Sequence, residues 1–396
     1  MPASPIQILT INAGSSSIKF SLFGSEILST PLLSGKIDRI GIRGTVLTFV
    51  DERNNHHGSL QLDRSDQKKA ASFLINWLQQ QIGFEKIHAV GHRLVHGWQH
   101  SEPEIISPVL LDDLRKIIPY APEHLPNEIL LIETLLQQYP KLKQVACFDT
   151  AFHQALPRVA KLLPIPRRFD ALGVQRYGFH GISYTFLMAK LAATYQNTSL
   201  PHRIILAHLG NGASMAAVLA GRCIDTSMGF TPSGGLVMGS RCGDLDPGVV
   251  HYIRDHEKLN NQQCNHLLNH QSGLLGVSEV SADMRDLLAL QNTDQRAAEA
   301  IELFCYQAKK WLGAYSASLN GLDTLVFSGG IGENAASVRA KICAGMQYLG
   351  IELDQTRNDN HENIISIADR PVTVHVIHTD EEQMIASMVV ELLAQQ

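Results

Sequence analysis

The chain has 396 residues, long enough for two or three domains that each bury a core, which excludes a small scaffold held together by disulfides or metal. Its 33 basic and 38 acidic residues give a formal net charge of −5 with histidine neutral, and only 18% of its residues are charged. A general nucleic-acid binder or a protein attached to anionic membranes is therefore not expected.

Cysteine usage and the N-terminus indicate a cytoplasmic protein with reduced thiols. The six cysteines show no CxxC spacing, and although His266 and His270 lie near Cys264, the asparagines around them argue against a zinc site. Residues 1–5 contain no basic region that leads into an apolar run, so no secretory signal is expected. The longest uncharged interval, 204–221, is interrupted by glycines and polar residues, and we interpret it as a buried hairpin and not as a membrane span.

The first predicted element is a strand, turn and strand. Apolar residues at 8–11 lead into the polar turn 12–17, and alternation resumes through 18–22. The same order returns at 204–219, where an apolar strand leads into the turn 210–214. Because the two turns lie half the chain apart, an internal duplication is one explanation, and chance similarity of two glycine turns is the other.

Further along the chain, the hydrophobic periodicity predicts helices that alternate with strands. Apolar residues at three- and four-residue spacing predict helices at 66–80, 111–120, 128–139, 294–319 and 380–396. Short apolar runs predict strands at 88–90, 144–148, 324–327 and 372–377. This alternation is typical of an α/β fold, and the lack of low-complexity linkers favours adjoining domains with a ligand cleft between them.

Three glycine-rich turns each follow a predicted strand, at 12–17, 208–212 and 328–334. Such turns allow backbone N–H groups to approach an anion without interference from Cβ atoms. None reads GxxxxGK[ST] and none reads GxGxxG, which argues against a P-loop and a Rossmann fingerprint. Ordinary hairpins also need glycines, but three turns, two of them in a repeat, favour a nucleotide polyphosphate.

Candidate charged groups lie in short polar phrases. Arginines flanked by glycines occur within 91–97, 176–181 and 239–244, where each either binds an anion or pairs with a nearby carboxylate. Asp149 ends an apolar strand, which is the usual position of a functional group in an α/β sheet, although the same residue type also caps helices.

Taken together, these phrases resemble the acetate kinase family. The segments that carry the resemblance follow the family's order over nearly the whole chain, at 9–19, 91–97, 148–153, 176–181 and 329–334. The resemblance implies an α/β fold of two duplicated ribonuclease H-like, actin-like ATPase domains with mixed five-stranded sheets and an interdomain cleft. It implies an N-terminal domain of 1–150 with the C-terminal helix 382–396, a nucleotide-binding domain of 151–381, and a homodimer.

The resemblance also assigns residues to roles. The family's metal ligands match Asn12 and Glu381, its catalytic acidic residue matches Asp149, and its transition-state stabilisers match His180 and Arg241. The residues that match its substrate site are Arg93, which would bind the carboxylate, and Val95, His124, Phe179 and Pro232. Those that match its nucleotide site are Lys19, His208, Leu209, Gly210, Asn211, Gly212, Asp283, Met284, Arg285, Gly330, Ile331, Gly332, Glu333 and Asn334.

The implied activity is reversible, Mg²⁺-dependent transfer of a phosphoryl group from ATP to acetate, with Mn²⁺ as an alternative metal. A carboxylate is already ionised at neutral pH and needs no general base, so we expect Asp149 to position the metal or its waters. Glu123 stands where the family commonly has leucine, which leaves propionate or butyrate open as the substrate. An alternative outside the enzymes is a non-catalytic protein with the same fold that is controlled by nucleotide binding.

Overall fold

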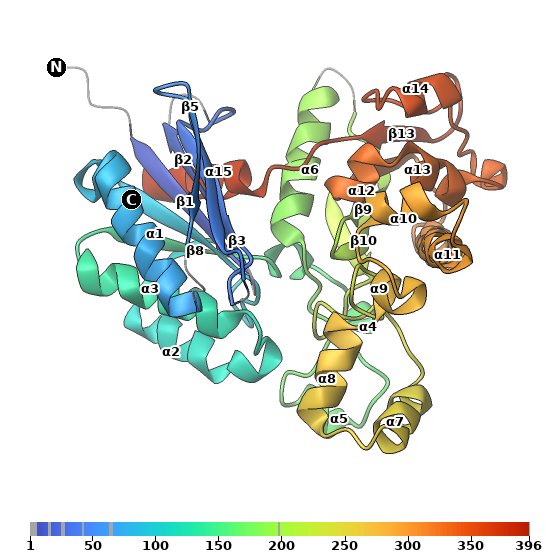
Figure 1. The fold of residues 1–396 in the computed structure, drawn as a ribbon. Coiled ribbons are helices and arrows are strands. Elements are labelled where there is room, and N and C mark those ends of the chain that lie inside the picture. Colours follow the sequence, from blue (N-terminus) through green and yellow to red (C-terminus); the bar gives the residue numbers. More distant parts are fainter. Residues whose placement is uncertain are drawn as a thin grey trace. The chain divides into compact units, whose positions relative to one another are not determined.

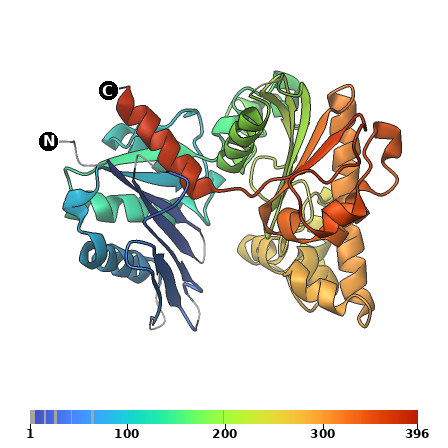
Figure 2. The same ribbon diagram turned by 90° about the horizontal axis from the view of Figure 1, so that it is seen from above.

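The computed structural model describes residues 6–14, 17–24, 28–41, 43–62, 66–196 and 199–395. The chain divides into two compact units, which we call unit 1 (Met1–Ala151 and Asp380–Gln396) and unit 2 (Phe152–Thr379). Each unit is a sheet with helices packed against it (Figures 1 and 2). The domain boundaries given above stay a prediction, because compactness alone does not show that a segment folds independently.

Unit 1 is built on a mixed sheet of eight strands in the order β5-β4-β3-β2-β1-β6-β8-β7. β1, β6 and β8 run parallel, whereas β1 to β5 form an antiparallel meander. The strands are β1 (Gln7–Ala13), β2 (Ile18–Gly24), β3 (Leu33–Asp38), β4 (Val46–Asp51), β5 (His56–Gln61), β6 (Ala89–Leu94), β7 (Glu104–Ile105) and β8 (Lys143–Phe148).

The expectation of five strands in this sheet is wrong, because β4, β5 and β7 extend it. β5 is exposed along nearly its whole length, so it lacks the alternation of apolar and polar residues that predicts a strand. The two-residue β7 pairs antiparallel with β8 at the opposite edge. The turn predicted at 12–17 includes Ser15 and Ser16, which lie outside the described residues.

Helices cover both faces of this sheet. They are α1 (Gln67–Ile82), α2 (Pro108–Lys116), α3 (Leu125–Gln138) and α15 (Glu381–Ala394), with short 3₁₀ turns at Phe84–Lys86 and Ile118–Tyr120. On the α1 face, Phe20 meets Trp77 with ring centroids 5.6 Å apart. On the other face, α15 packs so closely that a Cβ atom on Gly91 would lie 2.5 Å from Ile385 (Figure 2). The glycine thus allows α15 to pack directly on β6.

Unit 2 repeats the central part of this topology. Its five-stranded sheet has the order β11-β10-β9-β12-β13, with β9 (Arg203–Leu209), β10 (Ala213–Leu219), β11 (Arg222–Thr226), β12 (Thr324–Ser328) and β13 (Thr373–Val376). In unit 2, the strands β9 to β11 are antiparallel, as β1 to β3 are in unit 1. The strands β9, β12 and β13 run parallel, as β1, β6 and β8 do in unit 1. The predicted hairpin at 204–221 and the predicted duplication are both confirmed.

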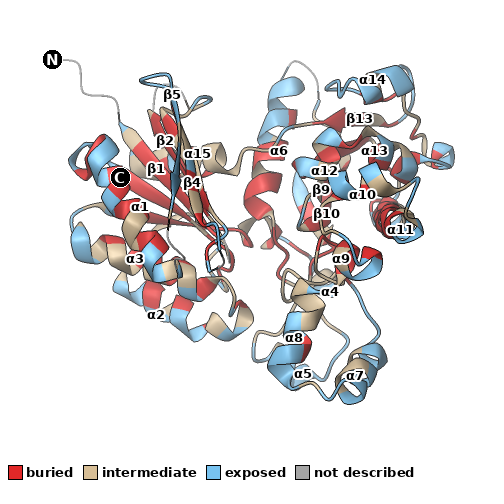
Figure 3. Ribbon diagram, in the orientation of Figure 1, coloured by how far each residue is buried: buried red, intermediate tan, exposed pale blue. Residues whose placement is uncertain are grey.

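Of the helices of unit 2, the sequence predicted only the one at 294–319, which corresponds to α11, and α6 shows why others were missed. α6 (Gly181–Thr194) is apolar around most of its circumference, so it lacks the one-sided stripe that marks a surface helix. The others are α4 (Arg158–Lys161), α5 (Arg167–Asp170), α7 (Pro247–His256), α8 (Asn261–His270), α9 (Gly273–Ser278), α10 (Met284–Leu290), α11 (Gln295–Ser318), α12 (Gly329–Asn334), α13 (Ala336–Cys343) and α14 (Gln355–Asp359), with 3₁₀ turns at Ala151–His153 and Gln347–Leu349. Figure 3 shows that the strands of the unit 2 sheet are largely buried, whereas α7 is largely exposed.

All six cysteines carry free thiols, and five of them are buried. Among the described residues, no helix combines the length and the apolar character that crossing a membrane requires.

Candidate functional site

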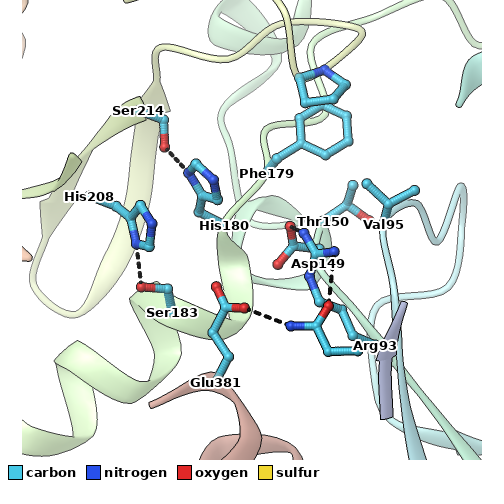
Figure 4. A network of polar contacts seen from close by, with 12 residues as sticks. Arg93, Val95, Asp149, Thr150, Phe179, His180, Ser183, His208, Ser214 and Glu381 are labelled. Carbon is cyan, nitrogen blue, oxygen red and sulfur yellow. Dashed lines mark hydrogen bonds and ion pairs between the residues drawn. The ribbon is translucent and has the colours of Figure 1, made fainter. Parts of the chain in front are cut away.

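In unit 1, the candidate residues gather at one edge of the sheet. Asn12 lies near the end of β1, Arg93 near the end of β6, and Asp149 directly after β8, while Glu381 is the first residue of α15. The carboxyl ends of the parallel strands β1, β6 and β8 meet at the same edge, which is the common position of ligand sites in α/β sheets. We call these four residues the unit 1 cluster, and Figure 4 labels Arg93, Asp149 and Glu381 of them.

Arg93 is the charged centre of this cluster. Its Nη2 donates to Asp149 Oδ2 at 2.8 Å, and its Nη1 lies 3.5 Å from Asn12 Oδ1. Burial alone would lower the pKa of Arg93, but the nearby carboxylates, Asp149 most of all and then Glu381, outweigh it and raise the pKa above its ordinary value. Its buried Nε has no hydrogen-bond partner within the described chain, so a donor remains for a ligand.

The Asn12 and Glu381 pair has the chemistry of a magnesium site. Asn12 Nδ2 donates to Glu381 Oε2 at 3.2 Å. Burial raises the pKa of Glu381, and the negative charge of Asp149 raises it further. The positive charge of Arg93 opposes this rise but does not cancel it, so the carboxylate lacks a full counter-charge. Mg²⁺ prefers hard oxygen ligands and usually takes one or two side chains together with water and phosphate oxygens. An amide oxygen and a carboxylate therefore fit this ion.

A second buried carboxyl group, which the sequence reasoning missed, lies beside Arg93. Glu128 stands in the first turn of α3 and is 2% exposed, and Val95 N–H donates to its Oε2 at 3.1 Å and its Oε1 at 3.3 Å. Burial raises the pKa of Glu128 to about 8 against the opposing effect of Arg93. The sequence pattern that could have indicated a buried Glu128 is its position on the apolar stripe that Leu125, Ile129 and Ile132 form.

The predicted acyl-pocket residues of unit 1 lie in the same region. Val95 is buried and follows β6 directly, and His124 is the half-buried residue before α3. The backbone after Val95 is held in place because Gly97 N–H donates to Thr150 Oγ1 at 3.1 Å. Glu123 is half-buried, and its effect on the acid stays a prediction.

In unit 2, His180 is held in an unusual backbone conformation. It has φ 58°, in the left-handed region, and directly precedes α6. This conformation costs a non-glycine residue about 1–3 kcal/mol and is concentrated at functional sites. The buried His153 bonds through Nε2 to the carbonyl oxygen of Phe179, one residue earlier, at 2.9 Å. This contact fixes the backbone of the buried Phe179, which directly precedes His180.

The His180 ring is oriented by hydroxyl groups. Its Nδ1 lies 2.8 Å from Ser214 Oγ, which lies 2.5 Å from Tyr184 Oη. The ring stacks on His208 with centroids 4.2 Å apart, and His208 Nδ1 lies 2.8 Å from Ser183 Oγ (Figure 4). The contact between Nδ1 and Ser214 therefore sets the orientation of the ring.

His180 and Arg241 converge on the glycine turn after β9. A Cβ atom placed on Gly212 would lie 3.3 Å from His180 Nε2 and 3.6 Å from Arg241 Nη1. The same Nη1 donates to the carbonyl oxygen of Pro232 at 3.0 Å, which fixes the guanidinium. Two groups that can donate to an anion therefore face one backbone turn. We call His180, His208, Gly212, Ser214 and Arg241 the unit 2 cluster.

A cavity of about 610 Å³ lies beside this turn, within the range typical of small-molecule sites. Its walls contain most of the predicted nucleotide-binding residues, namely Gly210, Asn211, Asp283, Met284, Arg285, Gly330, Ile331 and Asn334. Ala282, Leu288 and Ala335 complete the lining. Asp283 caps α10 through Arg285 N–H at 2.9 Å and pairs with the Arg285 guanidinium at 2.6 Å. The glycine turn and the first turns of α10 and α12 thus shape the cavity.

The remaining predicted nucleotide residues lie outside this cavity. Leu209 is buried in β9, and Glu333 Oε1 accepts from Gly329 N–H at 2.8 Å, which stabilises the start of α12. Gly332 is buried in α12. Lys19 belongs to unit 1, where it pairs in register with Asn12 across β1 and β2.

The chain as a whole is similar to known proteins. Residues 7–387 match the model of the Acetokinase family. The chain is 41% identical over 385 residues to the acetate kinase of Rhodopseudomonas palustris, with 96% of each chain covered. It is 40% identical over 394 residues to that of Halothermothrix orenii, with 96% of this chain and 98% of the other covered.

Two solved structures are similar over nearly the whole chain. Porphyromonas gingivalis acetate kinase has a TM-score of 0.88 at 37% identity, covering 98% of this chain and 100% of the other. A propionate kinase from Francisella tularensis has a TM-score of 0.90 at 38% identity, covering 97% and 98%. Both shared topology and shared sequence therefore support the fold.

Proposed function

This chain belongs to the Acetokinase family, and from that premise we propose that it transfers the γ-phosphoryl group of ATP reversibly to a short-chain carboxylate, with acetate as the first substrate. One observation carries the proposal. Arg93 is a buried cation at the end of β6 with an unpartnered Nε, beside an amide and carboxylate pair that suits Mg²⁺.

The proposed acid site is in unit 1. Arg93 binds the substrate carboxylate, and Val95 packs against the acyl chain with His124 nearby. Asp149 holds the Arg93 guanidinium in place through its 2.8 Å contact. Because the nucleophile carries no proton at neutral pH, Asp149 positions charge and does not act as a base.

The proposed nucleotide site is in unit 2. The cavity of about 610 Å³ holds the nucleoside, and the turn 210–212 presents backbone N–H groups to the phosphates. His180 Nε2 and Arg241 donate to the phosphoryl oxygens as the bond to ADP breaks, and Phe179 and Pro232, which the resemblance assigns to the acyl pocket, belong to the same unit as these two donors. Preorganised donors of this kind supply most of the catalysis of phosphoryl transfer.

Asn12 and Glu381 would hold a magnesium ion. When bound, the ion neutralises charge on the transferred phosphoryl group and its leaving group. Lys19, beside Asn12, adds positive charge at the same edge of the sheet. Mn²⁺ has the same preference for oxygen ligands and is the alternative.

We also propose a homodimer formed through unit 2. α4, α5 and α7 bury none of their residues, which is unusual for helices of a folded unit. Large apolar side chains are exposed on or next to them: Val159, Ile165, Phe169, Leu172, Val249 and Tyr252. Light scattering should report a dimer, which Tyr252→Glu should dissociate, whereas Val109→Glu on α2 should not. A monomeric wild-type protein would overturn this assignment.

The activity is tested by trapping the acyl phosphate with hydroxylamine. The protein, Mg²⁺ and ATP are incubated with acetate, propionate, butyrate or no acid. We expect hydroxamate only where an acid is present, with acetate giving the highest catalytic efficiency. A preference for propionate would favour the second substrate, as the similar propionate kinase suggests. Loss of ATP without hydroxamate, or no reaction, would contradict the proposal.

A further inference from the structure

A titratable group outside the assigned residues, Glu128, has unusual surroundings. It is buried on α3, although helix α3 presents the rest of its buried stripe as leucine and isoleucine. Carboxylates are almost never fully buried unless they are paired. Within the described chain, its hydrogen bonds come from the backbone of Val95 and not from a cationic side chain.

We infer that Glu128 is a positioning residue for the acid, which fixes Val95 and sets the charge beside Arg93, and that it thereby determines how tightly the carboxylate substrate binds. This inference deepens the proposed function and rests on it. It names a residue that neither the resemblance nor the comparisons single out.

The first part of the argument is geometric. Both oxygens of Glu128 accept from Val95 N–H, at 3.1 and 3.3 Å, so the side chain holds the backbone two residues after Arg93. Val95 is buried and supplies the proposed wall of the acyl pocket. Removing the acceptor would leave a buried N–H group without a partner and would release that wall.

The second part concerns charge. Asp149 and Glu128 are buried, and both act with Glu381 on the single guanidinium of Arg93. A bound carboxylate would be the fourth negative group near one arginine if all three side chains were ionised. Like charges in a buried site repel strongly, so the substrate binds best when Glu128 is neutral.

The surroundings of Glu128 favour that neutral state. Burial raises its pKa to about 8, while Arg93 from β6 lowers it and Asp149, after β8, raises it. His96, which follows Val95, has its pKa lowered to about 4 by burial and therefore adds no positive charge at neutral pH. Glu128 is thus protonated at pH 7 and becomes ionised as the pH rises through about 8.

The experiment compares Glu128→Gln and Glu128→Leu with the wild type. Glutamine keeps an acceptor for Val95 N–H and cannot ionise, whereas leucine removes the acceptor. We expect Glu128→Gln to keep the acetate KM near the wild-type value at pH 7, and Glu128→Leu to raise it about tenfold, with the ATP KM unchanged in both. Glu133→Gln, at a half-exposed position of the same helix, is the matched control and should change neither constant.

The pH profile separates positioning from a purely structural role. The wild-type acetate KM should rise from pH 7 to pH 9, and this rise should vanish in Glu128→Gln. The same rise in both proteins, or an unchanged acetate KM in Glu128→Leu, would overturn the inference. If Glu128→Leu does not fold, the Glu128→Gln profile still decides. An inactive wild type would contradict the proposed function, whereas an active wild type with unaffected variants would contradict only the role of Glu128.

Discussion

The two units share a strand order but differ in the chemistry that follows their strands. In unit 1, β1, β6 and β8 end at an amide, an arginine and a carboxylate, whereas in unit 2 β9 and β12 end at glycine turns. The shared topology therefore supplies only the edge of the sheet where a ligand can bind. The residues after the strands decide whether that edge suits an acid and a metal or a nucleotide.

The two clusters also differ in their electrostatics. The unit 1 cluster depends on one arginine that balances several buried carboxyl groups, two of which, Glu128 and Glu381, have raised pKa values. The unit 2 cluster depends on hydrogen bonds among histidines and hydroxyls that orient His180. Changes of charge should therefore affect unit 1 most, and changes of hydrogen-bond geometry should affect unit 2 most. The following variants test this contrast.

The largest effect is expected for Arg241→Ala in unit 2. Because its guanidinium acts on charge that develops during transfer, kcat should fall about 100- to 1,000-fold while the ATP KM changes little. Steady-state kinetics with varied ATP measures both constants. A loss confined to KM would remove Arg241 from the transition state.

For Arg93→Ala in unit 1 we expect a different pattern. The acetate KM should rise as well as kcat fall, since the contact to the carboxylate already exists in the ground state. The variant also leaves Asp149 buried without its ion pair, which typically costs about 3–5 kcal/mol of stability. Acetate saturation curves and urea unfolding measure the two effects. An unchanged acetate KM would exclude Arg93 from the acid site.

A third test uses two glycines with opposite surroundings. In Gly91→Ala the new Cβ would lie 2.5 Å from Ile385 and 2.8 Å from Val389, so the variant should lose about 1–3 kcal/mol of stability. It should also need more Mg²⁺, because α15 carries Glu381. A Cβ atom on Gly330 would meet no atom within 4 Å, so Gly330→Ala should keep the stability of the wild type. Because Gly330 lines the proposed nucleotide cavity, this variant should raise only the ATP KM. Equal unfolding midpoints for the two variants would contradict this.

The smallest effect is expected for the hydroxyl groups behind His180. Ser214→Ala removes the partner of Nδ1, and kcat should fall about tenfold, the value of one buried hydrogen bond. Tyr184→Phe, one step further away, should have a smaller effect of the same kind. Ser318→Ala, on the exposed end of α11, is the control. Equal kcat values for Ser214→Ala and this control would show that Ser214 does not orient the ring.

Sequence patterns predicted the repeated strand, turn and strand and the helices that correspond to α1, α2, α3, α11 and α15. They missed most of the other helices of unit 2 and several strands. Two examples are β5, which is exposed on nearly every residue, and α6, which is apolar on most sides. Backbone pairing with β4 determines β5, and burial against its neighbours determines α6, so local periodicity reveals neither element.

The site was predicted unevenly for a related reason. Arg93 and Asp149 lie in recognisable phrases, and the parallel strands bring them together. Three other residues act on partners that are distant in the sequence. Glu128 contacts Val95 over 33 residues, Ser214 contacts His180 over 34, and His153 contacts Phe179 over 26. Their roles therefore depend on how helices and strands pack. Only the buried position of Glu128 on α3 was visible in the sequence.

The most direct test of the proposed reaction follows the oxygen that attacks phosphorus. The protein converts ATP and acetate labelled with oxygen-18 in both carboxylate positions, and phosphorus NMR examines the products. Direct in-line transfer predicts an acyl phosphate whose phosphorus carries one labelled oxygen, the bridge to carbon, and ADP without label. An acyl phosphate with no labelled oxygen on phosphorus, or inorganic phosphate without any acyl phosphate, would contradict the mechanism.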